Sequence, residues 1–140
     1  MSFLRVWVHI VWGTKNKKKV LTEHVRKELF DHILLNAKEK NIYLDTINGY
    51  LDHVHCLISM NADLSISKVV QLLKGESAYW ANKNNLIATQ KLAWSDDYYA
   101  ISVSDSFVPK VRRYIRNQEQ KHKELTFSQS YQEFIKNYEF

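Results

Sequence analysis

Residues 50–59 (YLDHVHCLIS) form the stretch on which the predicted fold depends. The run reads as a strand, and the preceding Asn48-Gly49 pair is typical of a two-residue hairpin turn. Side chains of a strand point alternately to its two faces, so His53 and His55 share one face. The other face then carries the residues expected in the core: Val54, Cys56 and Ile58.

The sequence on either side of this stretch predicts three more strands. Each alternates apolar and polar residues or is rich in β-branched and aromatic side chains. The segments are residues 3–12 (FLRVWVHIVW), 42–47 (IYLDTI) and 98–104 (YYAISVS).

Two helices are predicted between these strands. Residues 22–40 and 64–83 carry apolar residues at helical spacing, with Thr22 and Ser65 as N-caps. Gly75 inside the second helix indicates a close approach by another helix or by DNA. The order strand-helix-strand-strand-helix-strand predicts an α+β, ferredoxin-like βαββαβ fold. Its antiparallel sheet has the two helices on one face and leaves the other face free for ligands.

Length and composition indicate one folded domain spanning residues 1–140. The net charge of +5 suits a polyanionic partner without distinguishing nucleic acid from an acidic protein or a membrane surface. Cys56 is the one cysteine, so no internal disulfide forms. The sequence has no apolar run of membrane-spanning length, and its first residues are expected to form a strand rather than a signal peptide. We therefore expect a reducing cytoplasm and no membrane partner.

Two imidazoles side by side on a strand supply two of the three protein ligands of a catalytic metal site. A purely structural, hydrogen-bonded pair is the alternative for His53 and His55. His9, alone on the first strand, is expected to be structural.

The segment after the fourth strand adds C-terminal helices to the fold. Residues 107–123 predict a helix with Ser106 as cap and a proline in its first turn. Tyr114 and Gln118 are four residues apart, so they share one helix face. A last helix capped by Ser128 has an apolar stripe that packs on its own domain or on a partner subunit: Tyr131, Phe134, Ile135 and Tyr138.

Two groups of basic residues are candidates for contacts with a DNA backbone. Arginine has forked donors that suit phosphate, and a lysine run is otherwise a solvated loop. The candidates are Lys15, Lys17 and Lys18 in the loop 13–19, and Arg112, Arg113 and Arg116 on the helix of Tyr114.

These motifs together resemble a known family. Residues 52–58 (DHVHCLI) resemble the His-hydrophobic-His signature of the HUH endonuclease superfamily. Residues 114–118 (YIRNQ) resemble the tyrosine helix of its single-tyrosine, IS200-like insertion-sequence transposases. The resemblance covers nearly the whole chain, including the lysine-rich loop and the fourth strand.

The resemblance implies a function and a site. His53, His55 and Gln118 would bind a divalent metal, Mg²⁺ or Mn²⁺, while Tyr114 attacks a DNA phosphate to form a 5′-phosphotyrosine link. The substrate would be single-stranded DNA hairpins at the element ends, processed near the nucleoid of a bacterial or archaeal cell. Relatives act as homodimers, which leaves open whether the tyrosine helix serves its own subunit or the other.

Three alternatives stay open on the sequence alone. One is a domesticated relative that nicks repeated chromosomal palindromes, and another is a non-catalytic module that binds single-stranded nucleic acid. The third is a metal hydrolase or an iron oxygenase, which needs a carboxylate ligand. Asp52 is the nearby carboxylate, and as the strand neighbour of His53 it is expected to point to the opposite face.

Overall fold

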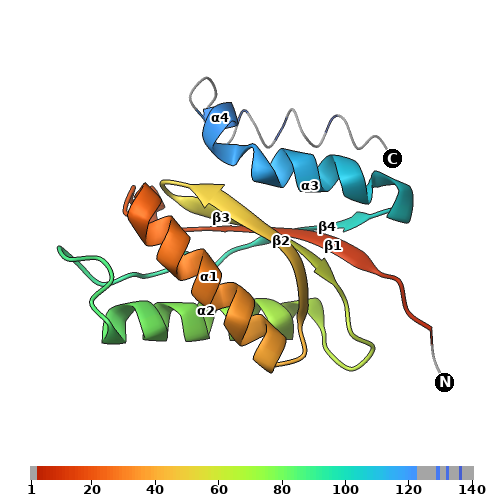
Figure 1. Ribbon diagram of the computed structural model, residues 1–140, viewed down its shortest axis with the longest axis horizontal. Coiled ribbons are helices and arrows are strands. Elements are labelled where there is room, and N and C mark those ends of the chain that lie inside the picture. The colour runs from red at the N-terminus through yellow and green to blue at the C-terminus, as the bar shows by residue number, and fades with distance from the viewer. Residues whose placement is uncertain (1–2, 123–128, 130–131, 133–135, 137–140) are drawn as a thin grey trace.

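The computed structural model describes residues 3–122 together with residues 129, 132 and 136. Within this part of the chain, four antiparallel strands form one sheet in the order β2-β3-β1-β4 (Figure 1). The strands are β1 Trp7–Gly13, β2 Tyr43–Tyr50, β3 His53–Ser59 and β4 Tyr99–Val103. This topology confirms the ferredoxin-like α+β prediction, with β3 and β1 in the centre of the sheet.

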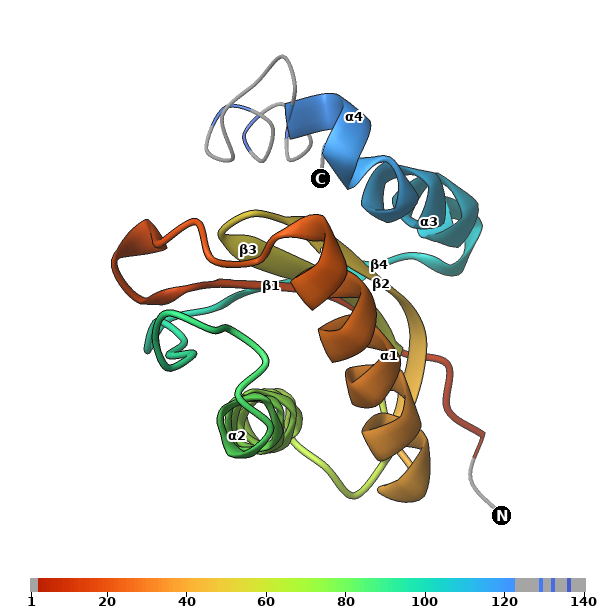
Figure 2. The ribbon, with the colours of Figure 1, turned by 60° about the vertical axis from the view of Figure 1, so that its left-hand side comes forward.

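Helices cover both faces of the sheet. The long helices α1 Glu23–Glu39 and α2 Ile66–Lys83 lie on one face, and the shorter α3 Val108–Arg116 and α4 Gln118–His122 lie on the other (Figures 1 and 2). The expectation of a face left open for ligands is therefore wrong, because the segment after β4 folds back over it. None of the described helices combines the length and the apolar character needed to cross a membrane.

The long helices begin where side chains cap them. The Thr22 hydroxyl accepts a hydrogen bond from the Val25 amide, and the Ser65 hydroxyl accepts one from the Lys68 amide at 3.1 Å. Such bonds satisfy amides that the first turn of a helix leaves without intrahelical partners. Both predicted caps are confirmed, and the apolar faces of the helices pack into one core cluster with β1 and β3.

The β2–β3 hairpin turns three residues later than predicted. Asn48 pairs with His55 and Gly49 with Val54, so β2 continues to Tyr50. The turn falls at residues 51–52, whose carbonyl groups accept hydrogen bonds from the amides of Leu21 and Thr14 at 2.9 and 2.8 Å. The Asn-Gly signal is thus overridden by long-range contacts that hold the turn elsewhere.

The first strand and the C-terminal helix also differ from their predictions. The first strand begins at Trp7 rather than residue 3, and Leu4 and Val6 are 44% and 43% exposed. The predicted helix 107–123 is divided, because a 3-10 turn precedes α3 and Asn117 separates α3 from α4. Ser106 lies in that 3-10 turn and does not cap α3. Most of the helix predicted after Ser128, including its whole apolar stripe, lies outside the described residues.

Two glycines give contrasting predictions for stability. A Cβ on Gly49 would lie 2.1 Å from the His53 carbonyl oxygen, whereas at Gly75 nothing lies within 4 Å. The close helix approach expected at Gly75 is therefore absent among the described residues. We expect Gly49→Ala to lower the free energy of unfolding by about 3 kcal/mol, the upper end of the cost of overpacking. Gly75→Ala should raise it by about 0.5 to 1 kcal/mol, the helix preference of alanine.

Urea unfolding of both variants beside the wild type measures these changes. Equal effects at the two positions would contradict the close approach of β2 and β3 at Gly49.

Candidate active site

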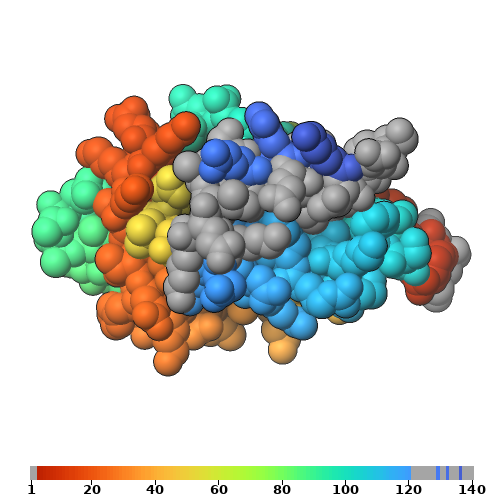
Figure 3. Space-filling model, turned by 90° about the horizontal axis from the view of Figure 1, so that it is seen from above, coloured from red at the N-terminus to blue at the C-terminus, as the bar shows by residue number. Residues whose placement is uncertain are grey.

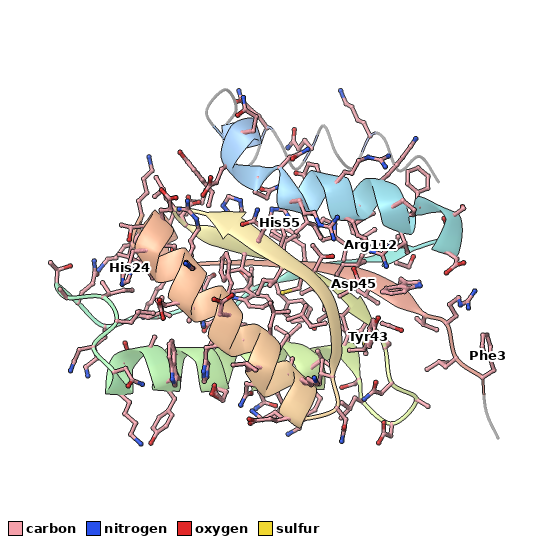
Figure 4. All side chains as sticks on the ribbon, in the orientation of Figure 1. Phe3, His24, Tyr43, Asp45, His55 and Arg112 are labelled. Carbon is pink, nitrogen blue, oxygen red and sulfur yellow. The ribbon has the colours of Figure 1, made fainter. Side chains whose placement is uncertain are left out.

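The two predicted histidines lie on the face of β3 that α3 and α4 cover. His53 and His55 are 1% and 0% exposed, and their ring centroids are 5.1 Å apart. Val54, Cys56 and Ile58 belong to the core cluster on the other face, as strand alternation requires. The shared face predicted for the histidines is confirmed, and Figure 4 shows His55 on β3 beneath the C-terminal helices.

Asp52 orients the ring of His53. The Asp52 carboxylate oxygen is 2.7 Å from His53 Nδ1, a geometry in which the ring N–H donates to the carboxylate. The expectation that Asp52 faces away from His53 is wrong, because Asp52 belongs to the turn and not to the strand. Its contact with Nδ1 places it on the opposite side of the ring from Nε2.

Gln118 meets the other side of the same ring. Its Oε1 is 3.3 Å from His53 Nε2, and its Nε2 donates to the Tyr114 carbonyl oxygen at 3.1 Å. With Nδ1–H turned to Asp52, Nε2 faces an amide oxygen that is an acceptor. A proton on Nε2 would donate to that oxygen, and an Nε2 without a proton presents a lone pair to it. Two acceptors facing each other at this distance are stabilised by a proton or a cation between them. The pair formed by His53 Nε2 and Gln118 Oε1 therefore fits a metal ion.

His9, which was expected from the sequence to be structural, lies in the same cluster as the two predicted histidines. It lies on β1, and its Nε2 is 2.9 Å from His55 Nδ1, with the two rings stacked at 5.1 Å. Burial lowers the pKa of His9 to about 3, so the ring is neutral under physiological conditions. The signal that could have revealed it is the pairing of β1 with β3, which sets His9 diagonally across from His55.

Tyr114 lies over this cluster in the same chain. Its half-buried ring is 5.6 Å from the His55 ring and 6.1 Å from the His9 ring, both edge-on. Gln118 is fully buried as the first residue of α4, although the helix is interrupted at Asn117. The structure therefore brings together four of the predicted site residues: His53, His55, Tyr114 and Gln118.

The predicted basic residues fall into three settings. Arg112 donates two hydrogen bonds to the Asp45 carboxylate on β2, at 2.7 and 2.8 Å (Figure 4). Arg113 and Arg116 are exposed on α3. Lys15, Lys17 and Lys18 are exposed in and after the 3-10 turn that follows β1, and Lys18 also donates to the Gln90 side chain at 3.2 Å. Contacts of these residues with DNA remain predictions.

The surface around the cluster combines three parts of the chain. In the view from above, the yellow β2–β3 hairpin reaches the surface between the red-orange segment after β1 and the blue α3–α4 arm (Figure 3). Gly13 pairs with His53, so the lysine-bearing turn starts beside the first site histidine. The lysine-bearing turn thus borders β3, and α3 meets the same hairpin where the Asn48 side chain donates to the Arg116 carbonyl oxygen at 3.0 Å.

No group of three or more histidine, cysteine, aspartate or glutamate side chains able to hold a metal is found among the described residues. The predicted set differs in kind, because it consists of two imidazoles and a carboxamide. Such a set leaves coordination positions open for oxygen ligands from a substrate.

The geometry defines a class of protein: a ferredoxin-like domain whose buried histidines are covered by a helix that carries a tyrosine. The chain belongs to the IS200-like transposase family, whose model matches residues 2–118. This match confirms the resemblance to the single-tyrosine HUH transposases. It places the protein among the enzymes of DNA transposition, and DNA is the substrate that the family implies.

Individual relatives agree with the family. The chain is 27% identical over 121 residues to the ISDra2 transposase TnpA of Deinococcus radiodurans, covering 81% of this chain and 84% of that protein. It resembles the crystal structure of a protein from Deinococcus radiodurans R1 assigned as a transposase, with TM-score 0.68, 26% identity, and coverage of 84% and 93%. The REP-associated tyrosine transposase bound to a REP hairpin has TM-score 0.61, 13% identity, and coverage of 87% and 72%, a likeness of fold alone.

The Asp45–Arg112 pair predicts a pH-dependent anchor for α3. The hydrogen bonds from Arg112 hold the pKa of the Asp45 carboxyl below its usual value. A lowered folded-state pKa stabilises the protein above the unfolded-state pKa of about 4, and this contribution is lost as pH falls through the folded-state value. We expect Asp45→Asn to lower the free energy of unfolding at neutral pH by about 1 to 3 kcal/mol.

Urea unfolding at a series of pH values measures this effect. The gap between wild type and Asp45→Asn should narrow below pH about 4. The control is Asp63→Asn, which changes an exposed aspartate before α2 and should leave the curve close to wild type. A constant gap across the whole pH range would contradict the anchor.

Proposed function

We propose that this transposase cuts and rejoins single-stranded hairpin DNA at the ends of an insertion sequence through a covalent Tyr114 intermediate. The observation that carries the proposal is the position of Tyr114, whose ring lies 5.6 Å from His55 in the same chain that sets Gln118 against His53. The ring that carries the proposed nucleophile and the side chains proposed as cation ligands thus belong to one cluster.

His53, His55 and Gln118 hold the divalent cation, Mg²⁺ or Mn²⁺, in this proposal. The convergence of the His53 and Gln118 acceptors at 3.3 Å supports this assignment. The bound cation supplies polarisation of the phosphate and a place for the leaving oxygen. Imidazole ligands bind Mn²⁺ more tightly than Mg²⁺, whereas the greater abundance of Mg²⁺ in cells favours its occupancy of the site.

Tyr114 is the nucleophile. Its Oη forms a bond to phosphorus while the bond from phosphorus to the 3′ oxygen breaks, leaving a 5′-phosphotyrosine and a free 3′ hydroxyl. An isolated phenol has a pKa of about 10, so the attack requires loss of its proton, which positive charge nearby favours. The link conserves the energy of the phosphodiester, so a 3′ hydroxyl rejoins the strand by the reverse step without ATP.

The exposed cations bind the DNA backbone around this centre. Lys15, Lys17 and Lys18 follow the end of the central strand β1, whose last residue Gly13 pairs with His53. Arg113 and Arg116 are exposed on α3. Arg112, engaged by Asp45, contributes its charge to the same surface. The protein then acts on chromosomal DNA at the nucleoid of a bacterial or archaeal cell.

The proposed assembly is a homodimer. Contacts within the described chain place Tyr114 over its own histidines, and two ion pairs hold the arm there: Asp45 with Arg112, and Arg26 with Glu119. Exchange of the arm between subunits requires both pairs to break. Action within one subunit is therefore the arrangement that these contacts favour.

We expect Tyr114→Phe to abolish the covalent protein–DNA adduct while DNA binding stays within about twofold of wild type. Phenylalanine keeps the ring packing against His55 and removes only the attacking oxygen. The measurement is a denaturing gel after incubation with Mn²⁺ and either a single-stranded hairpin or the matching duplex. An undiminished adduct would exclude Tyr114 as the nucleophile, and no adduct with the wild type would favour a non-catalytic binding module.

The same assay separates two biological roles. Preference for hairpins from the ends of the element supports transposition, whereas preference for repeated chromosomal palindromes supports a domesticated nicking enzyme.

We expect the metal-dependent formation of the protein–DNA adduct to require the site histidines. His53→Ala is expected to lower adduct formation by at least about 100-fold, since the ligand loss removes the cation that stabilises the reacting phosphate. The control is His24→Ala, because His24 is exposed on α1, away from the cluster (Figure 4). Adduct formation that survives both His53→Ala and EDTA would contradict a metal at this site.

A further inference from the structure

His9 has no role in the proposed reaction, yet it is among the most buried polar residues in the described part of the chain. Its side chain is 1% exposed and lies on the central strand β1, paired on both sides by β3 and β4. It contacts His55 through Nε2 at 2.9 Å and lies edge-on to the ring of Tyr114. A polar group in such a place requires a physical reason.

The contact with His55 constrains which ring nitrogen carries a proton. Both rings are almost fully buried, and burial disfavours the charged form of an imidazole. A hydrogen bond between two neutral imidazoles needs one N–H donor and one lone pair. If His55 Nδ1 donates, His55 Nε2 keeps a lone pair. If His9 Nε2 donates, His55 Nε2 carries the proton and cannot bind a cation.

We propose that His9 is a positioning residue that accepts a hydrogen bond from His55 Nδ1 and so holds His55 in the tautomer that binds the metal through Nε2. This inference rests on the proposed function, since it assigns a role toward the same cation. The pairing corresponds to that of His53, whose Nδ1 meets Asp52 at 2.7 Å. Partners of this kind raise the basicity of metal-binding histidines and fix their ring orientation.

Asp52 and His9, the residues that orient His53 and His55, differ in chemical type because they differ in burial. Asp52 belongs to the turn, where its side chain is 20% exposed, so a carboxylate there remains partly hydrated. His9 lies on the face of the sheet that α3 covers, where an isolated carboxylate would lose its hydration at a large free-energy cost. A neutral imidazole is thus the acceptor that this position tolerates.

The test begins with the metal-free wild-type protein. Nitrogen-15 NMR of the histidine rings should show His55 protonated at Nδ1. The same spectrum of His9→Leu should show the Nε2-protonated form, which predominates in free neutral imidazoles, or a mixture of both. A wild-type protein with His55 protonated at Nε2 would overturn the proposal without reference to any metal.

Mn²⁺ binding by calorimetry gives the second measurement. His9→Leu should weaken the affinity about 10- to 100-fold, the usual effect of removing such a partner. His9→Gln retains an acceptor and should stay within about threefold of wild type, provided that circular dichroism shows both variants folded. Equal affinities for wild type and a folded His9→Leu would overturn the role of His9.

His53→Ala separates this inference from the proposed function. If His53→Ala binds Mn²⁺ as tightly as the wild type, the metal site itself is wrong. If His53→Ala loses binding while His9→Leu keeps it, the metal site stands and the role assigned to His9 fails.

Discussion

Both faces of β3 are buried, and the organisation of the site depends on this constraint. One face contributes Val54, Cys56 and Ile58 to the core beneath α1 and α2, and the other presents His53 and His55 to α3 and α4. A slip of one residue in register would exchange the two faces and place both imidazoles in an apolar core. The apolar residues of β3 therefore fix the positions of the histidines between them.

Polar rings in such a place need hydrogen-bond partners, because an unsatisfied buried group costs about 1 to 3 kcal/mol. The partners come from three separate elements: Asp52 from the β2–β3 turn, His9 from β1 and Gln118 from α4. A network held from several directions is rigid, and this rigidity fixes the orientation of the ring nitrogens.

The arm that carries Tyr114 is attached differently. A small apolar cluster joins Leu57 to α3, and polar contacts add to it: Asp45 with Arg112, the Asn48 side chain with the Arg116 carbonyl, and Arg26 with Glu119. Polar contacts near the surface are separated at lower cost than a packed core. The histidines thus belong to the larger packed part of the fold, and the tyrosine belongs to a layer held by a smaller apolar cluster and a few charged groups.

The sequence by itself determined the βαββαβ order, the caps at Thr22 and Ser65, and the shared face of His53 and His55. These features follow from local periodicity and capping, which act over a few residues. The four-residue spacing of Tyr114 and Gln118 also predicted their proximity, although Asn117 interrupts the helix between them. Only the tertiary structure decided the position of the hairpin turn, the direction of Asp52 and the contact of His9 with His55. Each of these depends on the pairing of segments far apart in the chain, and strand register across a sheet is a non-local property that local patterns do not encode.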